Sequence, residues 1–125
     1  MNGIDWLLDT NVVIGLLKGH PAAIDLVQRS GLVLQRAAVS QITRMQLLGF
    51  PALTAEEASA VSAFLGACHV QSIDDGVEAE AIRLRRTGRL ELPDAIVLAS
   101  ATALGASLLT LDERLASVAA LHSGE

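Results

Sequence analysis

The chain has 125 residues, 51% of them hydrophobic and 18% charged, and its formal net charge at pH 7 is -5. This length allows one domain with one core, and so apolar a composition excludes an intrinsically disordered chain. The negative charge argues against a protein that coats nucleic acid, although a local basic patch can still serve a nucleic-acid enzyme. We therefore expect a single folded domain over residues 1–125.

Short apolar runs alternate with helical segments along the chain. In the first part we expect a strand, two helices, a strand and a helix over residues 4–8, 10–18, 21–29, 32–39 and 41–48. Thr54 and Glu57 then form a capping box for a helix that reaches residue 66. After it we expect a strand, two helices, a strand and a last helix over residues 69–73, 74–88, 93–105, 107–110 and from 112 onward.

This alternation predicts an α/β fold with a parallel sheet that helices cover on both faces. In such sheets the ligand crevice lies beyond the carboxyl ends of the strands. Asp9 directly follows the first expected strand, Asp112 follows the last one, and Asp94 lies in the first turn of a helix. We therefore expect these three carboxylates to share one edge, although each of them alone could cap a helix or offset a helix dipole.

Clustered carboxylates repel one another, and a hard divalent cation removes that penalty. Mg²⁺ typically takes one or two carboxylates, keeps several waters and leaves positions for phosphate oxygens. A bound ion can polarise a phosphodiester and lower the pKa of an attacking water. This chemistry needs no lysine or histidine, and the chain has a single lysine, Lys18, and three scattered histidines. The aspartates therefore predict a metal-binding acidic pocket.

Other classes of site fit the sequence less well. The chain has no Gly-x-x-x-x-Gly-Lys-Ser/Thr segment, which excludes a nucleotide-binding loop of that kind. The segment Asp9-Thr10-Asn11 lacks the Asp-x-Asp pair of haloacid-dehalogenase-type phosphatases, and no lysine follows a late strand as a response-regulator receiver requires. Ser40 fits a helix cap better than a nucleophile, because no histidine accompanies it in a recognisable pattern.

Cysteine usage and the lack of targeting signals indicate the cellular context. The single cysteine, Cys68, has no partner for an internal disulfide and no zinc-site spacing with the histidines, which fits a reducing cytosol. The first residues show neither a basic start nor a long apolar run, so no signal peptide is expected. Polar residues and glycine interrupt the longest uncharged stretch, between Asp94 and Asp112, so no membrane span is expected.

Four short segments contain the acidic residues and their surroundings. Residues 7–14 read Leu-Leu-Asp-Thr-Asn-Val-Val-Ile, residues 40–50 read Ser-Gln-Ile-Thr-Arg-Met-Gln-Leu-Leu-Gly-Phe, residues 92–96 read Leu-Pro-Asp-Ala-Ile and residues 109–112 read Leu-Thr-Leu-Asp. In order and spacing, and over almost the whole chain, they resemble the four motifs of PIN-domain proteins, particularly the VapC-type toxins of bacterial toxin–antitoxin modules. Each segment is weak alone, and the four together are fairly specific.

The resemblance implies a three-layer α/β/α sandwich around a central parallel sheet, with Mg²⁺- or Mn²⁺-dependent ribonuclease activity. Such a toxin would cleave RNA in the cytoplasm, form a homodimer and be blocked by a cognate antitoxin. The resemblance gives Asp9, Asp94 and Asp112 as metal ligands and places the catalytic positions at these residues and at Gln46. By the same resemblance, Thr110 and Asn11 would support the acids or contact the substrate.

The second segment departs from the family pattern at Gln46, where a glutamate is usual. Its amide oxygen can still reach a cation, but the side chain brings no charge and cannot act as a base. One missing charge at about 4 Å costs roughly 4 kcal/mol at an effective dielectric of about 20. We therefore expect weakened metal binding and reduced activity, whether Gln46 is natural or a deliberate substitution. The alternative is that Gln46 is an ordinary residue of the helix surface.

Two further departures concern Glu91 and the C-terminus. Glu91 stands where the family often has a basic residue, and its charge would hinder the approach of RNA. The chain ends soon after the last expected helix, so the family's final strand is expected to be short or missing.

Four arginines lie close together in the sequence: Arg83, Arg85, Arg86 and Arg89. Guanidinium groups bind phosphate through paired hydrogen bonds, so these residues are candidates for RNA contacts. Alternatively, they lie on a solvated helix face and pair with Glu78 and Glu80. The apolar helix over residues 54–66 is a candidate for the dimer or antitoxin contact, although most of its residues belong to the core.

The sequence thus predicts an endoribonuclease toxin with a weakened site, which hydrolyses RNA phosphodiesters with a metal-activated water. The main alternative is a non-catalytic protein of the same fold that binds an antitoxin or RNA. A third hypothesis, a small Mg²⁺-dependent phosphatase, predicts turnover of a simple phosphate ester without RNA cleavage.

Overall fold

The computed structural model describes residues 2–123, in which strands alternate with helices. The first elements are β1 (Trp6–Leu8), α1 (Thr10–Leu17), α2 (Pro21–Ser30), the short 3-10 helix η1 (Leu34–Arg36), β2 (Ala37–Ser40), α3 (Gln41–Leu48) and α4 (Ala55–Ala67). They are followed by β3 (His69–Gln71), α5 (Asp75–Arg86), α6 (Leu92–Leu104), β4 (Ser107–Leu109) and α7 (Glu113–Ser123).

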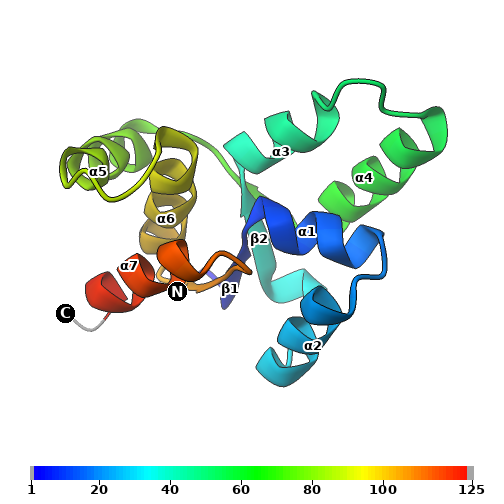
Figure 1. Ribbon diagram of the computed structural model, residues 1–125, viewed down its shortest axis with the longest axis horizontal. Helices are drawn as coiled ribbons and strands as arrows, with labels where there is room; N and C mark the ends of the chain where they lie inside the picture. The colour runs from blue at the N-terminus through cyan, green and yellow to red at the C-terminus, as the bar shows by residue number, and fades with distance from the viewer. Residues whose placement is uncertain (1, 124–125) are drawn as a thin grey trace.

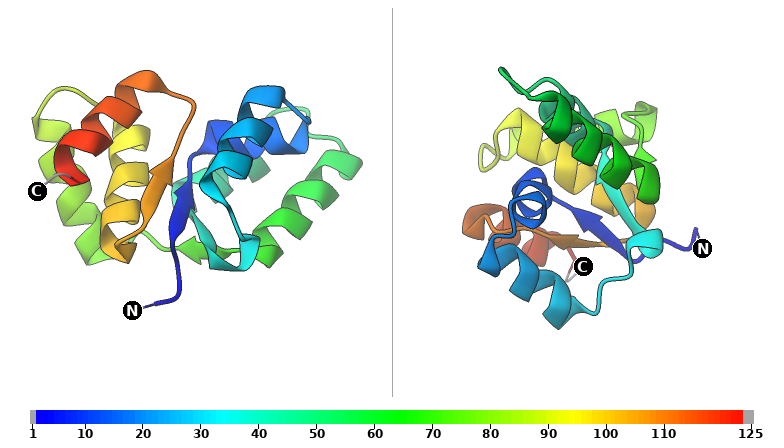
Figure 2. Two further views of the ribbon diagram at one scale, coloured as in Figure 1. Left: turned by 90° about the horizontal axis from the view of Figure 1, so that it is seen from below. Right: turned by 90° about the vertical axis from the view of Figure 1, so that its right-hand side faces the viewer.

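The strands found within residues 2–123 form one parallel sheet in the order β3-β2-β1-β4. Trp6 of β1 is in register with Ala37 of β2 and with Ser107 of β4, so β1 is a central strand. Helices α5, α6 and α7 lie on one side of the sheet, and α1, α2 and α4 lie on the other (Figure 1 and Figure 2). The fold is therefore the three-layer α/β/α sandwich that the resemblance implied.

Adjacent residues of β1 contribute to two different cores, because successive side chains of a strand point to opposite faces. Leu7 belongs to the core that contains Leu84 of α5 and Leu115 of α7. Leu8 belongs to the core that contains Val61 of α4. Complete burial of one leucine contributes roughly 1.5–3 kcal/mol, so packing from both sides fixes β1 and the position of the residue that follows it.

One prediction from the sequence is partly wrong: the strand expected over residues 32–39 begins only at Ala37. Gly31 ends α2 with a left-handed backbone (φ 69°), and the amide of Leu32 donates back to the carbonyl of Val27. Residues 34–36 then form η1, and the amide of Asp5 donates to the carbonyl of its last residue. Leu32 and Val33 connect α2 to η1, Leu34 lies within η1, and the pairing of β1 with β2 begins only at Trp6 and Ala37.

The remaining elements lie close to the predicted ranges. The capping box is present, since the amide of Glu57 donates to Oγ1 of Thr54 at 3.1 Å and the amide of Thr54 donates to Oε1 of Glu57 at 3.0 Å. Strand β3 ends at Gln71, two residues before the expected end, and α5 ends at Arg86, also two residues early.

The sheet ends at β4 in the described part of the chain. Helix α7 reaches Ser123, the last described residue, so the expectation of a short or missing final strand lies outside the described residues. Over the same range, none of the helices has the length and apolar character needed to cross a membrane.

Candidate acidic active site

Asp9 and Asp112 lie at the same edge of the sheet. Asp9 follows β1, and its amide donates to the carbonyl of Leu109 in the neighbouring strand β4 at 2.9 Å. Its Oδ1 accepts from the amide of Thr10 at 2.8 Å, so this carboxylate caps α1. Oδ1 of Asp112 accepts from the amide of Leu115 in α7 at 3.1 Å. Both acids therefore cap a helix and also occupy the predicted edge.

The hydroxyl of Thr110 links these two acids. It donates to Oδ2 of Asp9 at 2.7 Å and accepts from the amide of Asp112 at 3.0 Å. Asn11 holds the same loop, because its Oδ1 accepts from the amide of Leu111 at 3.1 Å and its Nδ2 donates to Oγ1 of Thr110 at 3.4 Å. Thr110 and Asn11 are thus placed to orient the carboxylates.

Asp94 joins this acidic cluster from the first turn of α6. Burial raises the pKa of its carboxyl group, and the charges of Asp9, Asp112 and Glu91 raise that pKa further. Burial also raises the pKa of Asp9, with a smaller contribution from Asp112, while hydrogen bonds from Thr110 and from the next backbone amide oppose the rise. Asp9 and Asp112 thus lie near enough to Asp94 for their charges to act on it, and Glu91 adds to the negative charge around it.

Among residues 2–123, no basic side chain forms an ion pair with Asp9, Asp94 or Asp112. The ion pairs found among residues 2–123 join Asp25 with Arg29, Asp5 with Arg36 and Glu80 with Arg83. An oxygen-liganded cation such as Mg²⁺ would relieve the repulsion. Within the same residues, no three Asp, Glu, His or Cys side chains are grouped closely enough to hold an ion by themselves. The structure therefore shows no ready-made metal site among these residues, and binding of an ion by one or two of the carboxylates with several waters stays a prediction.

Gln46 of α3 is exposed, yet it is bonded to the site. Its Oε1 accepts from the hydroxyl of Thr10, the residue next to Asp9, at 2.7 Å. Oγ1 of Thr10 also lies 2.8 Å from Oγ1 of Thr43, which is fully buried. Gln46 is therefore more than an ordinary surface residue, and the amide oxygen that the sequence left available to a cation is engaged by Thr10. Thr43 was missed, although its spacing of three residues from Gln46 on one helix was a usable signal.

A second pair of buried hydroxyls joins α6 to the start of α3. Oγ of Ser100 lies 3.0 Å from Oγ of Ser40, and both residues are fully buried. Oγ of Ser40 accepts from the amide of Ile42, which confirms this serine as the cap of α3, and Ser100 donates to the carbonyl of Ile96. The sequence indicated the cap but not the pairing, because the two serines come together only in the folded chain.

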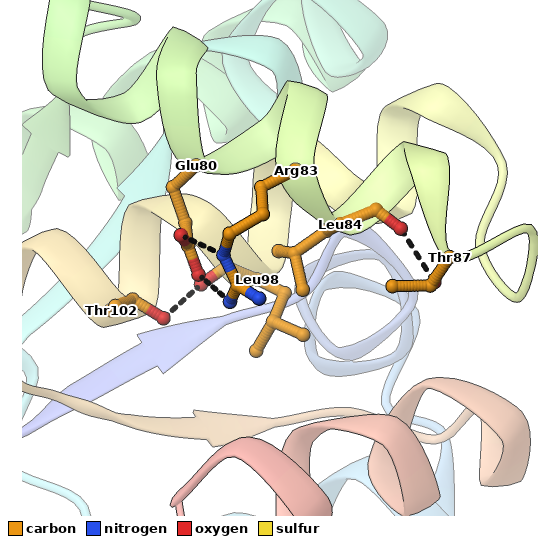
Figure 3. Close-up of polar contacts among 6 residues, drawn as sticks. All are labelled: Glu80, Arg83, Leu84, Thr87, Leu98 and Thr102. Atoms are coloured by element: carbon orange, nitrogen blue, oxygen red, sulfur yellow. Dashed lines mark hydrogen bonds and ion pairs between the residues drawn. The ribbon is translucent and has the colours of Figure 1, made fainter.

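The four clustered arginines do not share one environment. Nε and Nη2 of Arg83 donate to Oε1 and Oε2 of Glu80 at 2.8 and 2.7 Å on the same helix (Figure 3). Arg85, Arg86 and Arg89 are exposed at the end of α5 and in the loop that leads to α6. The pairing with an acidic neighbour is thus found for Arg83, and contact with phosphate stays a prediction for all four arginines.

A small apolar groove lies between α1, α3 and α4. Its volume is about 150 Å³, and its lining includes Leu17, Leu47, Phe50 and Val61. Phe50 is 60% exposed, which leaves most of its ring in water. An apolar partner would find a binding surface here, beside the helix that carries Gln46.

Residues 6–121 match the family model described as PIN domain. The chain is similar to a chain of a toxin–antitoxin complex from Klebsiella pneumoniae, with 28% identity, a TM-score of 0.75 and coverage of 86% of this chain and 87% of that one. It shares its fold with DNA-bound VapBC from Salmonella typhimurium (23% identity, TM-score 0.76, coverage 91% and 91%). The same holds for FitAcB from Neisseria gonorrhoeae (22% identity, TM-score 0.73, coverage 92% and 93%). No curated protein matches the chain.

Proposed function

This chain belongs to the PIN domain family, and on that premise we propose that it is a toxin-type endoribonuclease with a weakened, metal-dependent active site. The observation that carries the proposal is the cluster of uncompensated carboxylates formed by Asp9, Asp94 and Asp112 at the carboxyl edge of the sheet. The likeness to a chain of a toxin–antitoxin complex at 28% identity supports the assignment as a toxin.

The proposed reaction is the hydrolysis of an RNA phosphodiester, in which water adds to phosphorus and the bond to the leaving ribose oxygen breaks. Mg²⁺ or Mn²⁺ held by the aspartates would polarise the phosphodiester and lower the pKa of the attacking water. Hydrogen bonds from the Thr10 amide and the Thr110 hydroxyl fix one oxygen each of Asp9, so this carboxylate is oriented in advance. Within residues 2–123 no group donates to the carboxylate of Asp94, so both its oxygens remain available for a ligand.

Gln46 is the reason for proposing a weakened site. Its side chain is bonded to Thr10, next to Asp9, but it is neutral and supplies neither charge nor a base. A glutamate at this position has the same length, and one of its oxygens can accept the same hydrogen bond from Thr10.

The test is to restore the carboxylate. Purified Gln46→Glu protein, free of any partner, should cleave RNA with Mg²⁺ or Mn²⁺ at least about tenfold faster than the wild-type chain, because a bound ion contributes several kcal/mol to such a reaction. Gln28→Glu adds the same charge at an exposed position of α2 and should leave the rate unchanged. If neither the wild-type chain nor Gln46→Glu cleaves RNA with either ion, the ribonuclease proposal is wrong.

A non-catalytic PIN protein is the second candidate, and the neutral Gln46 favours it. In that case the fold serves only to bind a partner, and the aspartates need no ion. Calorimetry of Mn²⁺ binding to the wild-type chain, to Gln46→Glu and to Asp9→Asn separates the two candidates. Binding by the first two proteins that is lost in Asp9→Asn supports the enzyme, and no binding by any of them supports the alternative.

For the partner, we propose an antitoxin protein that covers the groove around Phe50. A protein that copurifies with the tagged chain from its native cells should suppress RNA cleavage by Gln46→Glu. Phe50→Asp should weaken both the copurification and the suppression, because it places a charge in an apolar contact. Suppression that is unchanged by Phe50→Asp would place the partner elsewhere.

The assembly and the location of the protein are also proposals. We propose a homodimer, which sedimentation of the purified chain measures directly. We propose a cytoplasmic location on the basis of the free thiol of Cys68, whose pKa burial raises and which therefore stays protonated and unreactive in a reducing compartment.

A further inference from the structure

The sheet has an open edge at β4. In the order β3-β2-β1-β4, this strand has a neighbouring strand on one side only within residues 2–123. Edge strands are commonly protected from further pairing by charged side chains, proline or a bulge. Residues 106–109 read Ala-Ser-Leu-Leu and carry no charge, whereas β3 at the opposite edge carries the polar side chains of His69 and Gln71. A further strand can therefore pair at β4.

The backbone of Leu108 points out of this edge. The amide of Ser107 donates to the carbonyl of Asp5 at 2.9 Å, and the carbonyl of Leu109 accepts from the amide of Asp9 at 2.9 Å. Ser107 and Leu109 thus face β1, and because backbone groups alternate sides along a strand, those of Leu108 face away from it. No partner for the N–H or the C=O of Leu108 is found among residues 2–123.

A groove of about 540 Å³ lies beside this edge, between β4, α6 and α7. Most of its lining residues are small, among them Ala101, Ala116 and Ala119. Leu108 also lines the groove, and its side chain packs against the core that contains Leu115 of α7. The groove and the outward backbone of Leu108 therefore form one surface.

We propose that the open edge of β4 pairs antiparallel with the same edge of a second copy of the chain, with Leu108 on the two-fold axis. In a hydrogen-bonded antiparallel pair, two opposite residues exchange both of their N–H···O=C bonds. Leu108 has its donor and its acceptor on the same side, so a two-fold axis satisfies both groups with no other partner. The two four-stranded sheets then form one continuous sheet.

The groove supplies contact that the short strands lack. A pair of three-residue strands is too small by itself, because specific protein interfaces bury about 1,200–2,000 Å² in total. The side chain of Leu108 points to the face covered by α6 and α7, so Leu108 of the second copy reaches the groove beside Ala116 and Ala119. Their small side chains leave room for it. This inference rests on the homodimer proposed above and does not depend on RNA cleavage.

The first experiment measures the dissociation constant of the dimer by sedimentation equilibrium. Leu108→Pro removes the outward N–H and keeps the ladder to β1, which runs through Ser107 and Leu109. It should raise the dissociation constant about tenfold or more, because the dimer loses two hydrogen bonds. Leu108→Ala shortens the side chain but keeps the N–H, so it should raise the constant less. Equal effects of the two variants would overturn the backbone pairing.

A disulfide tests the register of the pair. In a Cys68→Ser background, which removes the single native cysteine, Leu108→Cys places two thiols opposite each other. The Cα atoms of a hydrogen-bonded pair lie about 5.5 Å apart, within the range of a disulfide. Oxidation should therefore crosslink Leu108→Cys and not Ser107→Cys, because Ser107 lies opposite Leu109 of the second copy. Any other pattern of crosslinks would overturn the register.

A third variant blocks the groove without changing β4. Ala116 is exposed on α7, so Ala116→Trp fills the groove and spares the core. It should raise the dissociation constant about fivefold or more, the usual effect of overpacking a contact. Ala63→Trp at an exposed position of α4 is the matched control and should leave the constant unchanged. Thermal unfolding verifies that each variant is folded before dimers are compared.

The oligomeric state separates this inference from the proposals on which it rests. A monomer at every concentration would contradict both the homodimer and the pairing of the β4 edges. A dimer that Leu108→Pro and Ala116→Trp leave unchanged would overturn the pairing and keep the homodimer. RNA cleavage is measured separately, so either result leaves the ribonuclease proposal to its own test.

Discussion

The two halves of the acidic site are held in different ways. The strand half consists of Asp9, Thr110 and Asp112 at the ends of β1 and β4, where short hydrogen bonds connect each residue to the next. The helix half consists of Asp94 on α6 and Gln46 on α3, which reach the cluster from helices. Only one side-chain hydrogen bond, from Thr10 to Gln46, holds a residue of the helix half among the residues described.

This difference shows how the chain can hold a neutral residue in its site and keep its fold. The strand half is part of the sheet and of two helix caps, so its side chains contribute to folding as well as to the site. The helix half contributes the charge of Asp94 and the neutral amide of Gln46, and neither side chain caps a helix. We therefore expect substitutions in the strand half to disturb the positions of the site residues. Substitutions in the helix half should change the rate of the reaction and leave those positions intact.

The largest expected effect comes from Asp9 of the strand half. In the Gln46→Glu background, Asp9→Asn should reduce Mg²⁺-dependent RNA cleavage by about a hundredfold or more, because several kcal/mol of charge stabilisation are lost with the ligand. A quenched RNA substrate measures the rate. Asp25→Asn on α2 is the matched control, since this acid pairs with Arg29 outside the site. Equal rates for Asp9→Asn and Asp25→Asn would contradict the assignment of Asp9.

The next prediction compares the Thr110 hydroxyl of the strand half with the Ser100 hydroxyl on α6, the helix that carries Asp94. In the same background, Thr110→Val should reduce cleavage by about tenfold to a hundredfold, the usual effect of losing a group that orients a metal ligand. Ser100→Ala breaks the hydroxyl pair under α6 and should reduce cleavage by no more than about threefold, near the lower range for one hydrogen bond. If Ser100→Ala matches Thr110→Val, the helix half is as tightly organised as the strand half and the comparison fails.

The pH dependence of stability provides a smaller test. Burial raises the pKa of Asp9 in the folded chain, so the folded state binds this proton more tightly than the unfolded state. The stabilisation is complete below the unfolded pKa and is lost as pH rises through the raised folded pKa. Without metal, Asp9→Asn should therefore gain stability relative to the wild-type chain between pH 4 and pH 7, by about 1.4 kcal/mol for each tenfold difference in proton binding.

Asp5 is the control with the opposite sign. Arg36 lowers the pKa of this exposed carboxyl group, so its contribution is present above the unfolded pKa and is lost as pH falls. Asp5→Asn should therefore lose stability relative to the wild-type chain as pH rises towards the unfolded pKa of about 4, and this difference should stay constant between pH 4 and pH 7. Thermal unfolding with a chelator measures both differences, and a parallel trend for the two variants would show that the pKa of Asp9 is not raised.

The smallest expected effect concerns RNA contacts beside the helix half. Arg85→Ala and Arg86→Ala should each weaken RNA binding by Asp9→Asn protein only a few-fold and reduce the salt slope by about 1. Arg29→Ala on α2 removes an arginine that pairs with Asp25 and should change neither quantity. Fluorescence anisotropy at several salt concentrations measures both, and slopes unchanged by all three variants would place the RNA path elsewhere.

The sequence alone was sufficient to predict that Asp9 and Asp112 lie at the same edge of a parallel sheet. Strand β1 ends at Leu8 and β4 ends at Leu109, and these two ends are paired in the parallel sheet, so Asp9 and the loop that carries Asp112 lie at the same edge. The strand expected over residues 32–39 was too long, because its apolar residues matched a strand locally while β1 was too short to pair with them. Local sequence patterns thus predict whether a segment is a helix or a strand, whereas the neighbouring strand with which it pairs determines how long a strand is.

The sequence also shows which positions of the site carry a charge and that Gln46 is neutral. Hydrogen bonds between residues far apart in the chain were decided only by the tertiary structure, as with Thr43 and Thr10 or Ser40 and Ser100. The reason is physical: a hydroxyl has no periodic pattern and its direction depends on which neighbour buries it. The sequence therefore located the acidic site, and only the packing of α1 against α3 determined what Gln46 does there.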